Sequence, residues 1–242
     1  MTAVAVSFAI PCYNERDNLR PLLEAVTAEA ERLGLDHEIV ITDDCSTDGS
    51  WDLLKSLIGR YPRLRAQRLE ANSGESAASF AAIRASRGEI IVTLDADLQN
   101  DPRDLSKFLQ AMQGADCVCG TRRASRAQSD SWAKAMISRS SNWVRSRVLQ
   151  DRITDAGCTY RAFRRECVVD IPFFKGVHRF LPILLDMRGF RIVEVPVMNR
   201  QRHSGSSHYG VLDRFDAIVD MFAVRWMRAR MRGYRIAERV PD

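Results

Sequence analysis

The chain has 242 residues, which is enough for one large domain with a substantial core or for two small ones. With 45% hydrophobic and 28% charged residues, its composition excludes a disordered or fibrous protein. The formal net charge of +5 favours anionic partners, and nucleic acid, phospholipid and phosphorylated substrates all fit that sign.

Neither membrane-spanning nor disulfide-bonded architecture is expected from the sequence. The longest apolar run, Met1 to Asn14, is shorter than the ~18 residues of a spanning helix and lacks the positive start of a secretory signal. We therefore expect a cytoplasmic protein, in which a disulfide framework would be unusual. The cysteines then serve as small buried hydrophobes, and this applies to Cys12, Cys45, Cys117, Cys119, Cys158 and Cys167.

Over the first half of the chain, short apolar runs alternate with helical patterns. Strands are expected at Ala3–Ile10, Glu38–Thr42, Leu64–Leu69, Glu89–Leu94 and Asp116–Gly120. A helix with Asp17 or Asn18 as its cap and Gly34 as its stop follows the first strand, a second opens near Ser50, and a third spans Glu75 to Arg87. This alternation predicts an α/β fold with a doubly wound, mostly parallel sheet.

The second half is less regular. A basic loop, Arg122–Asp130, precedes a helix over Ser131–Leu149, an irregular stretch over Asp151–Thr159 and a strand at Arg191–Val197. A polar loop at Asn199–Gly210 leads into a helix from Val211. Because no linker or repeat is visible, we expect one domain over residues 1–210, followed by a C-terminal helix within 211–242.

The strongest chemical signal is the pair Asp95 and Asp97, directly after the apolar strand that ends at Leu94. Two carboxylates this close at a strand end are costly unless a cation or hydrogen-bond donors compensate them. Their oxygens suit Mg²⁺ or Mn²⁺, which takes further ligands from substrate phosphates. The alternative is that Asp97 or Asp101 caps a helix starting at Pro102.

Two other strand ends carry polar groups as well. Asp43 and Asp44 follow the second strand, and Tyr13 and Glu15 follow the first. A carboxylate at this edge accepts hydrogen bonds from a base or a ribose, whereas a plain turn would explain Asp48-Gly49. Ligands of such sheets bind beyond the carboxyl ends of the strands, so these groups are expected to meet there.

These motifs resemble the polyprenyl-phosphate, dolichol-phosphate-mannose-synthase-like branch of glycosyltransferase family 2, which has the GT-A fold. The resemblance runs from about Val4 to Tyr209. It rests on Ile10-Pro11-Cys12-Tyr13-Asn14-Glu15, Asp43-Asp44-Cys45-Ser46-Thr47-Asp48-Gly49, Leu94-Asp95-Ala96-Asp97-Leu98-Gln99, Gly120-Thr121-Arg122 and Arg202-His203-Ser204-Gly205-Ser206-Ser207-His208-Tyr209.

The resemblance implies roles for individual residues. Positions that hold the nucleoside are matched by Pro11, Tyr13, Glu15, Thr42 and Asp44, and those of the metal and diphosphate by Asp95, Ala96, Asp97 and Gln99, with Asp95, Asp97 and Gln99 as metal ligands. Positions that contact donor or acceptor phosphates are matched by Arg122 and Arg202, and the region that receives a lipid phosphate by Lys134, Ser138 and Arg139. The family usually has Lys where this chain has His208, and histidine is mostly neutral at neutral pH.

The implied activity is inverting transfer of a hexose from a nucleotide-diphosphate sugar to a polyprenyl phosphate, with Asp97, Arg122 and Asp155 as catalytic residues. A phosphate acceptor needs arginines for positioning, whereas a hydroxyl acceptor, such as a ceramide or glycerolipid, needs a base. Asp155 is that base, or else a structural turn residue. The segment Asn72–Ala78 is more similar to bacterial UDP-sugar members, so a UDP-sugar is expected ahead of GDP-mannose.

The C-terminal helix allows two interpretations. Its apolar stripe, which includes Phe215, Phe222 and Trp226, either packs on the domain or enters a bilayer surface while arginines meet anionic headgroups. The second interpretation makes the protein peripheral on the cytoplasmic face of a membrane, with or without a membrane-protein partner. A rival of another class, a basic module for phospholipid or nucleic acid, leaves the strand-end carboxylates unexplained, and we expect no nucleic-acid partner.

Overall fold

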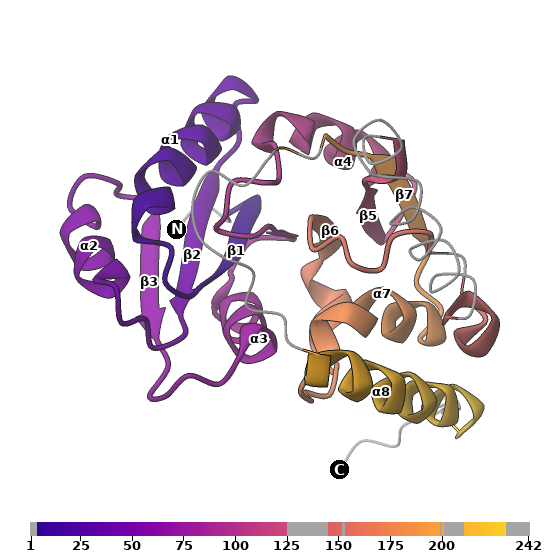
Figure 1. Cartoon of the computed structure of the whole chain (residues 1–242). Coiled ribbons are helices and arrows are strands. Elements are labelled where there is room, and N and C mark those ends of the chain that lie inside the picture. The colour runs from indigo at the N-terminus through magenta and orange to yellow at the C-terminus, as the bar shows by residue number, and fades with distance from the viewer. Residues whose placement is uncertain (1–3, 125–144, 152, 199, 201–210, 231–242) are drawn as a thin grey trace, which may run out of the picture.

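A sheet of seven strands forms the centre of the structure over the residues described, 4–124, 145–151, 153–198, 200 and 211–230, of this computed structural model (Figure 1). The strand order is β3-β2-β1-β4-β6-β5-β7. The strands are β1 (Val6–Cys12), β2 (His37–Asp43), β3 (Leu64–Arg68), β4 (Ile90–Thr93), β5 (Cys117–Thr121), β6 (Arg161–Arg164) and β7 (Ile192–Pro196). All pairs are parallel except those of β6, which runs antiparallel to both β4 and β5.

This architecture confirms the predicted α/β fold with a mostly parallel sheet. Each of the six predicted strands is present, with ends shifted by a few residues. Strand β6 was not predicted, because it has four residues, three of them buried, and no alternating pattern. The helix that follows β6 was not predicted either.

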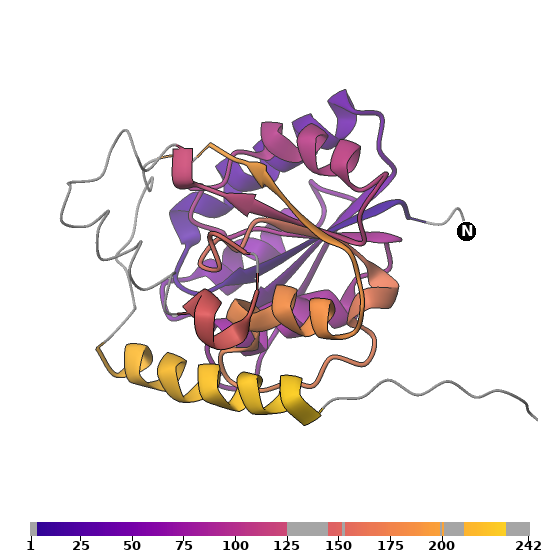
Figure 2. The same ribbon diagram turned by 90° about the vertical axis from the view of Figure 1, so that its right-hand side faces the viewer.

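Helices cover both faces of the sheet (Figure 1). On one face lie α1 (Arg16–Arg32), α2 (Ser50–Leu57) and α4 (Leu105–Ala111), the last preceded by a short 3₁₀ helix η1 (Pro102–Asp104). On the other lie α3 (Glu75–Ala85) and α7 (Val177–Met187), with the 3₁₀ helix η2 (Arg165–Val168) before α7. Helix α8 (Val211–Arg230) packs outside α7 (Figure 2).

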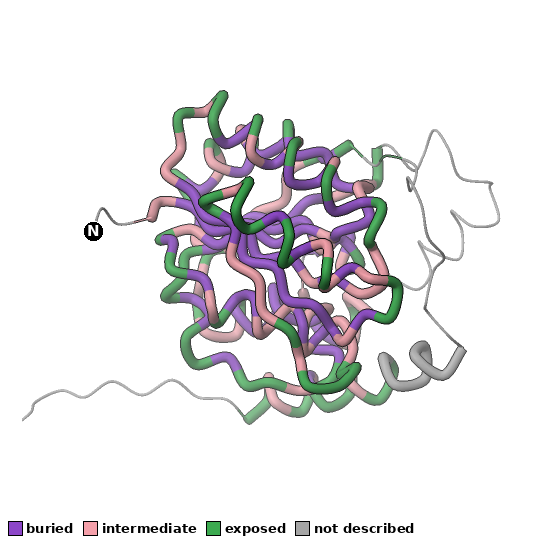
Figure 3. Tube along the Cα trace, turned by 90° about the vertical axis from the view of Figure 1, so that its left-hand side faces the viewer, coloured by how far each residue is buried: buried purple, intermediate pink, exposed green. Residues whose placement is uncertain are grey.

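Alternation along the strands fills two separate cores. Phe8, Ile10 and Ile41 point to the face covered by α1 and α4, whereas Ala9 and Val40 point to the face covered by α3 and α7. Both sets are at most 1% exposed. The buried strands run through the interior of the trace, and exposed residues gather on the outer sides of the helices (Figure 3). Burial on both faces explains why these strands are apolar almost without interruption.

The start of α1 differs from the prediction. The helix begins at Arg16 with Glu15 as its N-cap, so neither Asp17 nor Asn18 is the cap. Glu15 makes no side-chain cap hydrogen bond, and the side chain of Asn18 instead donates to the Glu15 carboxylate. The predicted stop at Gly34 is confirmed, since Gly34 has a φ of +64° one residue beyond the C-cap Leu33.

Helix α8 turns an apolar side away from the domain. The inner side carries Val224, which is fully buried, together with Met221 and Met227. The outer side carries four large apolar residues that are 51–68% exposed, namely Ile218, Val219, Phe222 and Trp226. These four side chains therefore do not pack on the domain, whereas Val224 does. Within the described residues, we find no helix with the length and hydrophobicity needed to span a membrane.

The close approach of Gly88 to β1 gives a stability test. A Cβ at Gly88 would lie 2.6 Å from the backbone nitrogen of Ser7, so Gly88→Ala forces β1 and β4 apart. We expect a loss of about 1–3 kcal/mol in the free energy of unfolding, measured by urea denaturation. Gly114→Ala is the matched control, because a Cβ there meets no atom within 4 Å. Equal stability of the two variants would contradict the close contact.

Candidate active site

The carboxyl ends of β1, β2 and β4 open onto a cleft of about 510 Å³. This is the edge at which parallel α/β sheets bind ligands. Of the ten residues predicted for the nucleotide sugar, all except Thr42 line the cleft, that is Pro11, Tyr13, Glu15, Asp44, Asp95, Ala96, Asp97, Gln99 and Arg122. The fold therefore brings together side chains that are more than 100 residues apart in the sequence.

Each of the three strand-end loops contains one non-glycine residue with a positive φ: Asn14 at +55°, Cys45 at +60° and Leu98 at +64°. Such conformations cost free energy and recur at functional sites. Two of the loops lock together, because Asn14 accepts at Oδ1 from the Thr47 amide at 2.8 Å and its own amide donates to Ser46 Oγ at 2.9 Å. The loops after β1 and β2 thus form one rigid wall of the cleft.

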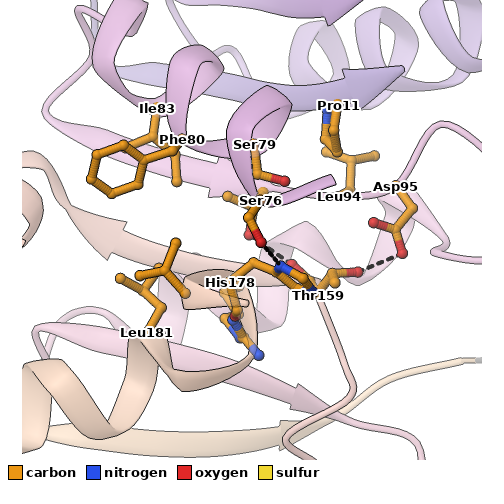
Figure 4. A pocket seen from close by; sticks show the side chains of 13 residues that line it. Pro11, Ser76, Ser79, Phe80, Ile83, Leu94, Asp95, Thr159, His178 and Leu181 are labelled. Carbon is orange, nitrogen blue, oxygen red and sulfur yellow. Dashed lines mark hydrogen bonds between the residues drawn. The ribbon is translucent and has the colours of Figure 1, made fainter. Parts of the chain in front are cut away.

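Asp95 and Asp97 stand at the centre of the cleft. Thr159 donates a 2.5 Å hydrogen bond to Asp95 Oδ2 (Figure 4), and the amide of Gln99 donates to Asp97 Oδ1 at 3.0 Å. Burial, followed by the charges of Glu75 and Asp97, raises the pKa of Asp95 to about 7, against the opposing effects of Thr159 and Arg122. Of the two residues that were alternatives for a helix cap, Asp101 is the cap, because its side chain accepts a hydrogen bond from the Arg103 amide at the start of η1.

The chemistry of this pair fits a divalent cation. Only one Asp95 oxygen has a hydrogen-bond partner among the described residues, and the crowding that raises its pKa is what a cation would relieve. No group of three or more His, Cys, Asp or Glu side chains able to hold a metal is found among the described residues. A cation on Asp95, Asp97 and Gln99 would thus need ligands from elsewhere, as Mg²⁺ does when it binds substrate phosphates.

Arg122 enters the cleft in a fixed orientation. Its Nε donates to Asp155 Oδ2 at 2.9 Å, one terminal nitrogen donates to Oδ1 at 3.0 Å, and its backbone amide also reaches Oδ2 at 3.0 Å. Such a two-pronged pair fixes the guanidinium plane. Glu194 of β7 holds the loop in turn, by accepting from the amides of Thr154 and Asp155. Asp155, at 6% exposure, does not line the cleft.

Two of the predicted nucleoside residues, Asp44 and Thr42, lie in different surroundings. The carboxylate of Asp44 lines the cleft and accepts from the amides of Ser73 and Gly74 at 2.7 and 2.8 Å. Burial, the largest influence, raises its pKa despite these bonds. Thr42 is fully buried, and its hydroxyl accepts from Gln67 at 2.9 Å, so in this conformation it supports β2 from inside.

The predicted acceptor residues cannot be placed. Lys134, Ser138, Arg139, Arg202 and His208 all lie outside the described residues. In the predicted loop that contains Arg202 and His208, Arg200 is described and is bonded to residues beside the central carboxylates. Its backbone amide donates to the carbonyl of Gln99 at 3.0 Å, and its guanidinium pairs with Asp101 at 2.6 Å. The segment after β7 therefore begins at the edge of the cleft.

Comparison with known proteins identifies the family of this chain. A family model described as glycosyl transferase family 2 matches residues 7–171. The chain belongs to glycosyl transferase family 2. The match includes every cleft residue from Pro11 to Thr159 and confirms the resemblance found in the sequence.

Two relatives of this chain are named as transferases that act with undecaprenyl phosphate. The undecaprenyl-phosphate 4-deoxy-4-formamido-L-arabinose transferase of Edwardsiella ictaluri is 34% identical over 217 residues, which is 89% of this chain and 66% of that protein. The enzyme of the same name from Aeromonas hydrophila is 34% identical over 218 residues, again 89% and 66%. The chain thus spans slightly less than two thirds of the length of these relatives.

Two solved structures of other proteins share the fold. A mannosyltransferase from Pyrobaculum calidifontis, in complex with GDP-mannose and Mn²⁺, aligns with a TM-score of 0.63 at 17% identity over 97% of this chain and 66% of its own. The glucosyl-3-phosphoglycerate synthase of Mycobacterium tuberculosis, in complex with Mg²⁺ and UDP, aligns with a TM-score of 0.65 at 18% identity over 95% and 81%. These likenesses confirm the predicted GT-A fold.

One wall of the cleft was not predicted from the sequence. This wall is formed by the start of α3, by the start of α7 with the turn before it, and by one residue of α8. Its members are Glu75, Ser76, Lys175, Gly176, His178, Arg179 and Asp220. The turn at Lys175-Gly176 before an apolar helical pattern was the available signal, and Gly176 indeed has a φ of +94°.

His178 gives a pH-dependent prediction. Burial lowers its pKa to about 4, assisted by the charges of Arg179 and Arg161 and opposed by Glu75. The unfolded chain takes up this proton near pH 6.5, so stability is complete above about pH 6.5 and falls as the pH drops toward 4. Between about pH 7 and about pH 5 we expect His178 to account for a loss of about 2 kcal/mol.

The measurement is urea denaturation of the wild type and of His178→Gln at both pH values. The variant lacks the titrating group, so its stability should fall less on acidification. An identical pH dependence in the two proteins would show that His178 is not buried as a neutral ring.

Proposed function

We propose that this chain is an inverting, metal-dependent glycosyltransferase that transfers a hexose from a nucleotide-diphosphate sugar to a polyprenyl phosphate. The observation that carries the proposal is the cleft in which Asp95 and Asp97 stand beside Arg122. Cleavage of a sugar–diphosphate bond develops negative charge on the leaving phosphate, and a divalent cation bound there would supply positive charge to it. Arg122, held rigid by Asp155, supplies a second positive group without reorganisation.

The arrangement around Asp155 supports a phosphate acceptor over a hydroxyl acceptor. A hydroxyl needs a base, and both oxygens of the predicted base, Asp155, already accept hydrogen bonds from Arg122. A phosphate is ionised near neutral pH and needs positive groups to position it. Lys175 and Arg179, at the start of α7, line the cleft and can supply them. The names of the 34%-identical relatives support the same acceptor class, an undecaprenyl or similar polyprenyl phosphate.

For the donor, we propose a UDP-sugar ahead of GDP-mannose. The support is the likeness of the segment Asn72–Ala78 to UDP-sugar enzymes, and Asn72, Ser73 and Gly74 all line the cleft. Structures with the same fold hold either UDP or GDP-mannose, each with a metal ion.

Donor use is tested by nucleotide release from UDP-glucose, UDP-N-acetylglucosamine and GDP-mannose with Mg²⁺ or Mn²⁺. We expect release with one base only, abolished by EDTA, and a fall of at least ~100-fold in Asp97→Ala, which loses a carboxylate at the leaving group. Thermal stabilisation by the matching nucleotide with metal is the accompanying binding measurement. Metal-independent binding that survives in Asp97→Ala would instead favour a basic binding module.

We also propose that the protein acts at the cytoplasmic face of a membrane, on which α8 lies. Its outer side exposes Phe222 and Trp226, and its inner side carries Asp220 into the cleft, so the apolar surface lies beside the site that would receive the lipid. Arg230 in the last turn suits anionic headgroups, whereas Arg225 and Arg228 bond to Gln150 and Asp186 of the domain. This orientation would deliver the acceptor phosphate to the cleft without lifting the lipid from the bilayer.

Co-sedimentation with vesicles of phosphatidylcholine and phosphatidylglycerol tests this placement. Replacing Phe222 and Trp226 together by Ser should weaken binding by about tenfold or more, because two large apolar groups no longer enter the interface. Ile58→Ser, which removes an exposed apolar residue beside α2, should bind like the wild type. Unchanged binding by the double variant would contradict the proposal.

A further inference from the structure

Glu75 is a cleft residue that the proposed chemistry leaves without a role. It is the first residue of α3, and its side chain is 32% exposed at the wall that faces Asp95 and Asp97. Its negative charge is, after burial, the next largest influence that raises the pKa of Asp95. The start of a helix also favours a negative side chain.

His178, in α7, lies next to the Glu75 carboxylate. Its Nε2 lies 3.6 Å from Glu75 Oε1, and its Nδ1 shares a 2.6 Å hydrogen bond with the hydroxyl of Ser76 (Figure 4). The same hydroxyl accepts from the Gly176 amide at 2.8 Å, and the carbonyl of His178 accepts from the buried Arg161. The imidazole is thus fixed between α3 and α7, and it limits the directions in which Glu75 can point.

The chemistry of the donor narrows what Glu75 could bind. A carboxylate repels phosphates, which Arg122 and a cation on Asp95 and Asp97 would hold. The nucleoside end lies at Asp44 and Tyr13, beside β1 and β2. The sugar is the remaining part of the donor, and its hydroxyl groups are donors that a carboxylate accepts well.

We propose that Glu75, positioned by His178, accepts hydrogen bonds from the hydroxyl groups of the donor sugar and thereby selects the sugar. This inference rests on the proposed function. A role as a further metal ligand is less consistent with the structure, because Glu75 does not form a metal-binding group with Asp95 and Asp97 among the described residues. Its place between the central pair and α7 is where a sugar must lie to meet an acceptor from the α7 side.

The test compares epimeric donors in the presence of Mn²⁺. Calorimetry gives the affinities of UDP, UDP-glucose and UDP-galactose or, where GDP is the nucleotide that binds, of GDP, GDP-glucose and GDP-mannose. We expect the wild type to discriminate between the epimers and Glu75→Gln to lose about ten- to hundredfold in affinity for the preferred one. Affinity for the nucleoside diphosphate should stay within about twofold, because Glu75 does not contact it.

Two further variants complete the design. Glu24→Gln, on an exposed position of α1, is the matched control and should behave like the wild type. His178→Gln should reduce the discrimination between epimers in the same direction as Glu75→Gln. In the double variant the two effects should not add, because a residue that acts through Glu75 has nothing left to position. A merely structural role of His178 would weaken binding of all ligands equally.

The outcomes separate this inference from the function on which it rests. If the wild type binds neither UDP nor GDP with Mn²⁺, the proposed function fails. If it binds one of them but treats the epimers alike, or if Glu75→Gln keeps the discrimination, only the role of Glu75 is overturned. The same holds if Glu75→Gln weakens nucleoside diphosphate binding equally, which would make Glu75 a metal ligand, or if it abolishes only transfer, which would make it a base.

Discussion

Like charges gathered at one edge of the sheet are the constraint around which the rest of this structure is arranged. Asp44, Asp95 and Asp97 converge on the cleft, with Glu15 and Glu75 nearby, at the ends of strands that are otherwise apolar. Each carboxylate would be costly in isolation. The chain compensates with backbone amides at Asp44 and Asp97, a hydroxyl at Asp95, and a guanidinium across the cleft.

What remains uncompensated determines the chemistry of the site. The pKa of Asp95 is still raised to about 7, mainly by burial and then by its acidic neighbours. Such a site would attract a cation, and a bound cation would attract phosphates. This local electrostatics is the support that the strand-end carboxylates give to the proposed nucleotide-sugar donor.

The half of the site that sequence predicted follows a simple geometric rule. In a parallel sheet the carboxyl ends of the strands share one edge, so polar residues after β1, β2 and β4 had to meet. The rule fails at β6, which runs antiparallel, with Thr93 beside Arg161 and Ile90 beside Arg164. There the residues that precede the strand reach the cleft, which is why Thr159 was missed and why Asp155 could not be assigned to Arg122.

The remaining wall required tertiary information of another kind. Glu75 begins a helix that sequence predicted correctly, but which way its first turn faces depends on the packing of α3 against α7, and α7 itself was not foreseen. The same applies to Asp220, which α8 carries into the cleft only because its apolar stripe points outward. A hydrophobic stripe fixes the axis of a helix, and the neighbours decide which side is covered.

The antiparallel insertion of β6 also makes the cleft a product of two separate parts of the chain. Strands β1 to β4 all come from the first 93 residues, whereas Thr159 and Asp155, which bond to Asp95 and Arg122, lie just before β6. The parallel half of the sheet therefore supplies the carboxylates, and the second half supplies groups that hold them. The parallel half could exist as a sheet with no functional cleft, so ligand affinity reports that the second half has docked, and a bound donor holds the two halves together by mass action.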